Sequence, residues 1–385
     1  MTEILVIYPH DNLSTNPTMF GLVQELATRG VAVSIMTPTK LLLEKWVPSS
    51  AASVRLLSWP PPYFVHPTGR RSIRRALKSA FAARRLQKYS AILGADPAGI
   101  AIASRLNDRA RRPLVYLSFE LIFEREVENA YEVELKLNER AAARASDLIL
   151  IQDEERRDAF CEENGVDPAR CVLVPVAPVD ARPKRTNYLR DKLGIPTDKT
   201  IVLYQGSLYD WSCRNEFAEM VSYWSDEFRL VIHSRDQPGK RMMAFMRELC
   251  ANSQIYFTNQ PVPPSELPIL TASADVGLAC YRATFDSWLT GKNLRLLGLA
   301  SGKIAYYTMC GLPVLARSLA SIEAIQAKYR FGLSYKRISE SASALKKITA
   351  NWDSMSKAAR AFYEERLDPD QPIRYFCDRL LSMAA

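Results

Sequence analysis

The stretch ILVIYPHDNLSTNPTMFGLVQELATRGVAVSIMT, residues 4–37, contains the unit from which the fold is built. Its first four residues are all apolar, as in a strand that is buried on both faces of a parallel sheet. Asn16 and Pro17 supply an N-cap and a first-turn proline, and Gly30 ends the helix that they begin. The apolar run at residues 31–36 is typical of a second strand. The stretch therefore predicts a strand, a loop, a helix and another strand.

The same alternation continues as far as residue 176. Further apolar runs predict strands at residues 91–94, 114–117 and 147–151, with helices near residues 98–110 and 126–145. Strands that are separated by helices of this length connect through right-handed crossovers and form a mostly parallel sheet. The first half of the chain is therefore predicted to be one doubly wound α/β unit.

A stretch rich in proline and charge, VAPVDARPKRTNYLRDKLGIPTDKT, interrupts this pattern and predicts a hinge at residues 181–198. The alternation then restarts, with strands predicted at residues 201–204, 230–233, 255–258, 276–281, 313–316 and 331–335. A chain of 385 residues suits two such domains. We therefore predict an α/β fold with two Rossmann-like, doubly wound parallel sheets, at residues 1–180 and 199–365. A C-terminal helix within residues 366–385 is expected to pack back on the N-terminal domain.

The composition disfavours several classes of protein. The sequence has no run of about 18 apolar residues, and its first residues are typical of a strand and not of a signal sequence. We therefore expect a cytoplasmic protein. The seven cysteines are scattered and form no Cys-x-x-Cys pair, so they are expected to be reduced. No histidine stands near cysteines or carboxylates at metal-ligand spacing, so no metal is expected. The net charge of +9 indicates an anionic partner, which could be nucleic acid, a membrane or a phosphorylated substrate.

Two common phosphate-binding fingerprints are absent from the sequence. The loop after the first strand, residues 9–16, contains no glycine, and no GxxxxGK[ST] motif occurs anywhere. Nicotinamide chemistry and P-loop phosphoryl transfer are therefore disfavoured, and no cofactor is expected.

The stretch FDSWLTGKNLRLLGLASGKIAYYTMCGLPVLA, residues 285–316, contains a candidate anion site. Ser301, Gly302 and Lys303 stand at the predicted start of a helix. Backbone N–H groups at a helix N-terminus bind anions, and the lysine adds a full positive charge, so a diphosphate would fit there. The alternative is an ordinary helix start with a solvated lysine.

The same stretch resembles the donor-binding region of retaining GT-B glycosyltransferases of family 4. The matching residues are Asn293, Ser301, Lys303, Gly311, Pro313 and Val314. Residues 4–37, 94–96, 118–121 and 203–217 are similar to other parts of the same family, in the same order. The resemblance implies a GT-B architecture, in which an N-terminal acceptor domain and a C-terminal donor domain face a cleft. It also implies a UDP- or GDP-sugar donor, retention of anomeric configuration and no need for a metal.

The resemblance implies roles for individual residues. The implied donor-binding residues are Gly206, Ser207, Arg214, His233, Asn293, Ser301, Gly302, Lys303 and Tyr306. The implied catalytic residues are Glu120, Arg214 and Lys303, and His10, at the end of the first strand, is expected to substitute as a polar contact for the histidine that relatives carry. Arg214 and Lys303 would neutralise the leaving diphosphate. The alternatives are an exposed arginine in the first turn of a helix for Arg214 and an incidental loop histidine for His10.

The sequence departs from the family in two places. Many relatives carry a Glu-x7-Glu pair, whereas this chain has Gly298 and Tyr306 at those positions. Relatives often have His-Glu at the end of the fourth strand, whereas this chain has Phe119 and Glu120. The stereochemical outcome and catalytic competence therefore stay open at this point.

A basic segment at residues 70–88 holds eight positive residues and no acidic one. They are Arg70, Arg71, Arg74, Arg75, Lys78, Arg84, Arg85 and Lys88. The segment follows the aromatic loop SWPPPYFVHP and can form an amphipathic helix, which predicts docking on an anionic membrane. The alternative is a solvated basic face whose apolar side packs on the sheet. Nucleic acid is disfavoured because no known binding motif accompanies the cluster.

Three functional hypotheses follow. The first is a glycosyltransferase that builds a cell-surface polysaccharide or glycolipid on a glycan or lipid-linked acceptor, at the inner face of the cell membrane. The second is a catalytically inactive GT-B relative that binds a glycan or a membrane. The third is an epimerase or phosphorylase, which is disfavoured because no pyridoxal-type lysine context and no general acid pair stand out.

Overall fold

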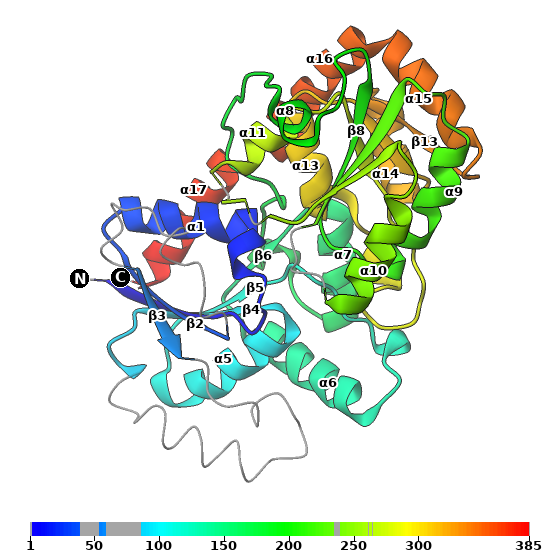
Figure 1. The fold of residues 1–385 in the computed structure, drawn as a ribbon. Coiled ribbons are helices and arrows are strands. Elements are labelled where there is room, and N and C mark those ends of the chain that lie inside the picture. The colour runs from blue at the N-terminus through cyan, green and yellow to red at the C-terminus, as the bar shows by residue number, and fades with distance from the viewer. Residues whose placement is uncertain are drawn as a thin grey trace. The chain divides into compact units, whose positions relative to one another are not determined.

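The computed structural model describes residues 2–38, 54–58, 86–234, 239–260, 262–263 and 265–384 (Figure 1). Most of the predicted basic helix at residues 70–88 lies outside these ranges. The chain divides into two compact units. The first unit comprises Met1–Val176, Phe285–Asn293 and Pro369–Ala385, and the second comprises Ala177–Thr284 and Leu294–Asp368.

The first unit contains a seven-stranded parallel sheet in the order β3-β2-β1-β4-β5-β6-β7 (Figure 1). Its strands are β1 (Glu3–Ile7), β2 (Ala32–Thr37), β3 (Val54–Ser58), β4 (Ala91–Ala95), β5 (Leu114–Leu117), β6 (Leu148–Ile151) and β7 (Cys171–Leu173). The chain runs outward from β1 to β3 and returns to β4 on the other side of β1. The carboxyl ends of β1 and β4 therefore form a topological switch point, where open α/β sheets bind ligands.

Helices cover this sheet. They are α1 (Pro17–Thr28), α5 (Asp96–Ala110), α6 (Ala130–Ala145), α7 (Glu154–Asn164) and α17 (Asp370–Ala384), with 3-10 turns at Leu13–Thr15, Glu124–Glu126 and Pro168–Arg170. The side chain of Asn16 accepts a hydrogen bond from the N–H of Met19 and caps α1, as its sequence position predicts. The C-terminal helix α17 shares the apolar core of this unit with α1 and the sheet, because Phe376 and Leu380 are fully buried there.

The second unit contains a six-stranded parallel sheet in the order β10-β9-β8-β11-β12-β13. Its strands are β8 (Thr200–Gln205), β9 (Phe228–His233), β10 (Ile255–Thr258), β11 (Val276–Ala279), β12 (Val314–Arg317) and β13 (Gly332–Tyr335). The switch point here lies between β8 and β11. The predicted fold class, two Rossmann-like parallel sheets with helices, is thus confirmed.

The helices of the second unit are α8 (Tyr188–Leu193), α9 (Phe217–Ser222), α10 (Lys240–Leu249), α11 (Leu267–Thr271), α13 (Gly302–Met309), α14 (Ala320–Tyr329), α15 (Glu340–Ala350) and α16 (Trp352–Phe362). Short turns occur at Asp210–Ser212, Arg214–Glu216 and Gly298–Ala300, and a π-helix at Tyr363–Leu367. A Cβ atom on Gly277 would lie 2.3 Å from Cγ of Tyr307, so glycine in β11 permits the close approach of α13. This contact fixes the position of α13 on the sheet.

The division into units differs from the predicted boundaries in two places. The segment predicted as a hinge, residues 181–198, belongs to the second unit and contains α8. Residues Phe285–Asn293, which the sequence places in the donor domain, cluster with the first unit. The short helix α12 (Lys292–Arg295) spans this second boundary. The first difference arises because Arg190 of α8 pairs with Asp275 and donates to the carbonyl groups of Pro196 and Lys199.

Candidate functional site

Each unit has a group of polar side chains at the carboxyl edge of its sheet, next to its switch point. The group in the second unit gathers around the N-terminus of α13. Ser301 is the N-cap of this helix, and its hydroxyl accepts a hydrogen bond from the N–H of Ile304 at 3.3 Å. The same hydroxyl shares a 2.7 Å hydrogen bond with the hydroxyl of Tyr281. This hydrogen bond therefore links the N-terminus of α13 to the segment that follows β11.

The ammonium group of Lys303 lies among three aromatic rings. Its Nζ atom is 4.6 Å from the ring centre of Tyr281, 5.1 Å from that of Tyr204 and 5.3 Å from that of Trp211. We call these three residues the aromatic triad. A cation at this distance from aromatic faces is attracted by their quadrupoles. The triad thus holds a positive charge at the carboxyl ends of β8 and β11.

Gly206 leaves the space that the Lys303 side chain occupies. A Cβ atom at residue 206 would lie 2.8 Å from Cε and 3.2 Å from Nζ of Lys303. The glycine also has a φ of +135°, which side chains rarely allow. The structure therefore brings together two predicted donor-binding residues, Gly206 and Lys303.

The aromatic triad continues into a stack that reaches the surface. The Trp211 ring is nearly parallel to that of Tyr281, with centres 6.1 Å apart, and to that of Tyr209, with centres 5.9 Å apart. Tyr209 is 52% exposed. Flat aromatic faces of this kind can pack against a nucleobase or a sugar ring. None of these aromatic residues was predicted to be a site residue, because each appears as an ordinary apolar position in the sequence.

Arg214 is held in a salt bridge within its own loop. Its Nε atom donates to Oδ1 of Asp210 at 3.1 Å, and its Nη1 atom donates to the carbonyl oxygen of Leu208 at 3.3 Å. The arginine side chain is 29% exposed. A phosphate group would therefore have to share Arg214 with Asp210.

Two further arginines of the second unit were missed by the sequence reasoning. Arg282 and Arg317 each form a 2.9 Å salt bridge with one carboxylate oxygen of Glu216. They lie at or just beyond the carboxyl ends of β11 and β12, where ligands bind in such sheets. Their positions at strand ends could have identified them. Glu216 neutralises part of their charge and holds both side chains in place.

His233 and Ser207 lie close to Gly206 in the second unit. The N–H group of Gly206 donates to the carbonyl oxygen of His233 at 3.0 Å, and His233 and Ser207 are each 3% exposed. Burial, with a smaller effect of the charge on Lys192, lowers the pKa of His233 to about 4. The imidazole is therefore neutral at pH 7. Its Nδ1 atom has no hydrogen-bond partner among the described residues.

Tyr306 lies in the apolar core of the second unit and is 8% exposed. Burial raises the pKa of its hydroxyl. The ring therefore occupies a packing position, whereas a donor contact was expected from the sequence. Residues 304–309 of α13 are all buried, so Tyr306 shares its burial with the whole second half of the helix, and its contact with a donor stays a prediction.

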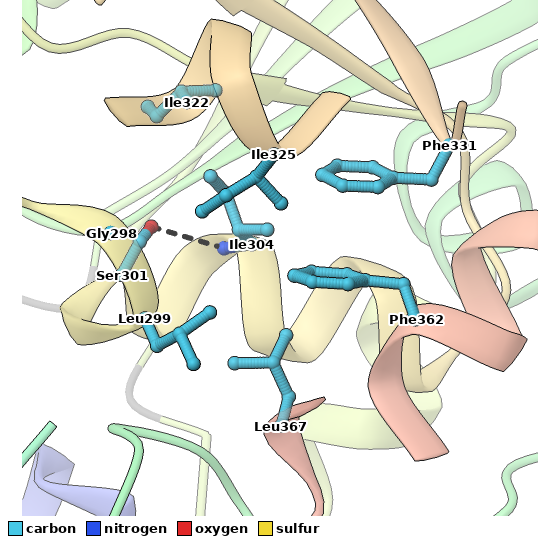
Figure 2. Close-up of a pocket in the computed structure, with 9 residues that line it drawn as sticks. All are labelled: Gly298, Leu299, Ser301, Ile304, Ile322, Ile325, Phe331, Phe362 and Leu367. Carbon is cyan, nitrogen blue, oxygen red and sulfur yellow. Dashed lines mark hydrogen bonds between the residues drawn. The ribbon is translucent and has the colours of Figure 1, made fainter. Parts of the chain in front are cut away.

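A small apolar hollow lies beside the start of α13, between α13, α14 and α16 (Figure 2). The rings of Phe331 and Phe362 stack at one side of it with centres 4.6 Å apart, and Ile304 and Leu367 approach from α13 and the π-helix. The hollow is too narrow to admit a water molecule. It is a packing feature of the core that borders the N-cap Ser301.

The group in the first unit joins three loops at the carboxyl edge of its sheet. His10 follows β1, Asp96 follows β4, and Glu120 follows β5. The Nε2 atom of His10 lies 3.0 Å from Oδ2 of Asp96. The other oxygen of Asp96 accepts hydrogen bonds from the N–H groups of Phe119 and Glu120, both at 2.8 Å. Asp96 therefore connects the two predicted catalytic residues of this unit, and it was not itself predicted.

Asn293 is also part of this group. Its amide nitrogen donates to Oε2 of Glu120 at 2.6 Å, and its amide oxygen accepts from the N–H of Leu121 at 2.9 Å. Arg156, which is fully buried, donates to the same amide oxygen and to the carbonyl oxygen of Phe119. The structure thus places Asn293, an expected donor-binding residue, beside Glu120 in the first unit.

Burial and neighbouring charges change the acidity of these groups. Burial and the negative charge of Asp96 raise the pKa of Glu120, although Arg156, Asn293 and His10 act in the opposite direction. Burial lowers the pKa of His10, but the contact with Asp96 and the charges of Glu120 and Asp11 outweigh it, so the net shift is upward. Perturbed groups that gather at a ligand-binding edge indicate a functional site.

Within the described part of the chain, no group of three histidine, cysteine, aspartate or glutamate side chains is arranged to hold a metal ion. Among the same residues, no helix combines the length and the apolar character needed to cross a membrane.

The chain is similar to known proteins in sequence over part of its length and in fold over nearly all of it. Residues 15–177 match a family model described as a glycosyl transferase 4-like domain. No curated protein matches the sequence. The structure is similar to that of Alr3699/HepE from Anabaena in complex with UDP and glucose, with a TM-score of 0.76, 13% identity and coverage of 99% of this chain and 100% of that chain.

Two other solved structures share the fold over nearly the whole chain. Sucrose-phosphate synthase from Thermosynechococcus elongatus has a TM-score of 0.73 and 15% identity, and the match covers 100% of both chains. WaaG, a glycosyltransferase involved in lipopolysaccharide biosynthesis, has a TM-score of 0.66 and 16% identity, and the match covers 98% of both chains. These similarities confirm the fold that the sequence predicts.

Proposed function

We propose that this chain, a glycosyltransferase of the GT-B fold similar to family 4, moves a sugar from a UDP-sugar to a hydroxyl group of a glycan or lipid-linked acceptor. The observation that carries the proposal is the Lys303 ammonium, held by the aromatic triad at the carboxyl edge of the second sheet. The similar structure of Alr3699/HepE contains UDP and glucose, which favours a uridine nucleotide.

Lys303 and the first N–H groups of α13 would bind the diphosphate of the donor. When the bond between the anomeric carbon and the phosphate oxygen breaks, its electron pair stays on the diphosphate. A positive charge that is already in place stabilises this leaving group without having to reorganise. Arg214 would add a second charge once it shares its salt bridge with Asp210. The proposed reaction therefore needs no metal.

The first unit would bind the acceptor, with His10 and Glu120 at the carboxyl edge of its sheet. We propose transfer with retention, in which the acceptor oxygen attacks the face that the diphosphate leaves and a phosphate oxygen takes the hydroxyl proton. In this route the donor phosphate accepts the proton, so transfer does not depend on a carboxylate at Gly298 or Tyr306. A strong side-chain base is not required by it.

We also propose that the enzyme works in the cytoplasm as a peripheral protein at the inner face of the cell membrane, in the synthesis of a cell-surface polysaccharide or glycolipid. The basic segment at residues 70–88 supports this proposal by its charge, since each basic residue near an anionic surface contributes about 1 kcal/mol. Binding to vesicles with and without phosphatidylserine would test it. Equal binding to both would contradict it.

The central test is calorimetric binding of UDP-glucose, UDP and GDP, followed by an assay of sugar transfer. Lys303→Ala should weaken the binding of UDP by about tenfold or more, because one charged contact is worth about 1.5–3 kcal/mol. Lys328→Ala is a matched control, since this lysine also lies over a tyrosine ring, 4.7 Å from the centre of Tyr329, but is exposed on α14. Equal affinity in wild type and Lys303→Ala would refute the donor site.

A second candidate function is a binding protein that has lost catalysis. The residues Gly298 and Tyr306 favour it, because many relatives carry a glutamate at each of these two positions. Such a protein would bind UDP-glucose without transferring or hydrolysing it. Release of UDP in a steady-state assay distinguishes the two functions.

A further inference from the structure

His10 and Asp96 meet at the switch point of the first sheet. Strands β1 and β4 are neighbours in the sheet, and their carboxyl ends lead directly to these two residues. The Nε2 atom of His10 lies 3.0 Å from Oδ2 of Asp96, and the histidine side chain is 38% exposed whereas that of Asp96 is 4% exposed. The imidazole can therefore be reached by a ligand, while the carboxylate contacts it from the protein side.

Asp96 is fixed in place by its own backbone and by the next strand. It has a φ of +56° at the first position of α5, a conformation that aspartate and asparagine tolerate better than most residues. Its Oδ1 atom accepts hydrogen bonds from the N–H groups of Phe119 and Glu120. The remaining oxygen, Oδ2, is the one that faces His10. The carboxylate thus has little freedom to turn away from the ring.

The charges that face His10 come from three elements. They are Asp96 at the start of α5, Glu120 after β5 and Asp11 in the loop that carries His10. Arg156 of α7 interacts electrostatically with both Asp96 and Glu120. Because the carboxylates outweigh the effect of burial, the pKa of His10 lies above its ordinary value. The direction of this shift agrees with the short distance between His10 and Asp96.

We propose that Asp96 is a positioning residue, which fixes the His10 imidazole at the carboxyl edge of the first sheet so that the ring orients the acceptor hydroxyl. This inference rests on the proposed glycosyl transfer. A carboxylate that contacts one ring nitrogen determines the orientation and the protonation of a histidine. The acceptor hydroxyl would then meet a ring in a single orientation, and the ring would donate a hydrogen bond to the acceptor oxygen while the hydroxyl proton passes to the donor phosphate.

A double-mutant cycle tests the coupling. With UDP-glucose as donor and octyl glucoside as the acceptor probe, Asp96→Asn should lower kcat/KM by about ten- to hundredfold, the cost of a misplaced reacting group. In a His10→Gln background the same change should cost less than about twofold, because Asp96 then has no ring to position. An equal loss in both backgrounds would overturn the proposal. The basic limb of the pH profile should also move to lower pH in Asp96→Asn, which a merely structural role would not cause.

A direct titration keeps the inference testable if no transfer is observed. The chain has three histidines, so NMR of the labelled protein can follow His10, with His10→Gln to assign its signal. The pKa of His10 should fall in Asp96→Asn, because an opposite charge is removed. Asp147→Asn is the control: this aspartate also accepts a backbone N–H bond, from Leu114, at the amino end of β5. An unchanged titration in Asp96→Asn would refute the inference, whereas absence of transfer with a shifted titration would count against the proposed function alone.

Discussion

The ring of Tyr281 contacts Lys303 of helix α13, and its hydroxyl contacts Ser301, the N-cap of that helix. The ring centre lies 4.6 Å from Nζ of Lys303, and the hydroxyl hydrogen-bonds to Ser301 at 2.7 Å. One tyrosine thus positions both the positive charge and the helix N-terminus that would face a diphosphate. The two effects can be separated by substitution.

Tyr281→Phe keeps the ring but removes the hydrogen bond to Ser301. We expect the affinity for UDP to fall about fivefold, because one buried hydrogen bond contributes about 1 kcal/mol. Tyr281→Leu also removes the cation–π contact and should weaken binding by a further twofold to tenfold, about 0.5–1.5 kcal/mol. Isothermal titration with UDP measures both. Tyr223→Phe, at an exposed tyrosine of the same unit, is the control, and equal affinities in all the variants would contradict the assignment.

Gly206→Ala should displace the Lys303 side chain, since the new Cβ atom would lie 2.8 Å from Cε of the lysine. We expect the affinity for UDP to fall about tenfold, corresponding to about 1.4 kcal/mol. Gly194→Ala is a matched control, because Gly194 also has a positive φ but a Cβ atom there would have no atom within 4 Å. Both variants should lose about 1–2 kcal/mol of stability through backbone strain. The loss of affinity should disappear when Gly206→Ala is made in the Lys303→Ala background, and its persistence there would argue against this contact.

Much of the fold could be predicted because parallel strands are uninterrupted apolar runs. Strands β1 and β9 are buried along almost their whole lengths, so their sequences alone identify them. Strand β3 was missed because its residues, VRLLS, do not form an uninterrupted apolar run: an arginine stands at its second position. The helix expected near residues 126–145 begins at Ala130, because Asn129 caps it and a 3-10 turn precedes it.

The candidate site was predictable only where one short stretch contains the chemistry. Ser301, Gly302 and Lys303 are consecutive, and the structure places them at the start of α13 as the sequence predicts. Asp96 and Arg156 were missed because their partners lie 23 to 137 residues away in the chain. A single sequence shows which side chains can form hydrogen bonds, but long-range packing decides their partners. Asn293 illustrates the difference.

Asn293→Ala should destabilise the first unit and leave the binding of UDP unchanged within about twofold. The substitution leaves Arg156 and the N–H of Leu121 without the amide oxygen that they share, so we expect a loss of about 3 kcal/mol. Chemical unfolding followed by hydrogen exchange locates the loss. Asn351→Ala, at an exposed asparagine whose side chain donates to the Lys347 carbonyl, should cost less than about 1 kcal/mol. A large loss of UDP affinity with unchanged stability would restore the donor-binding role that the sequence suggests.

His233 should make the second unit less stable at low pH. Its pKa is about 4 in the folded protein, against an ordinary value of 6.5, so the unfolded chain binds a proton that the folded chain excludes. The folded state is therefore favoured above pH 6.5 and loses stability as the pH falls from there toward 4, by about 2 kcal/mol at pH 5. Unfolding by urea at pH 7 and pH 5 measures this loss. His233→Gln should remove that part of the pH dependence, because glutamine does not titrate. The carboxylates and the other two histidines contribute equally to the pH dependence of both proteins. An identical decrease in wild type and His233→Gln would mean that the ring is protonated in the folded state, and the buried surroundings of His233 would then have to accommodate a charge.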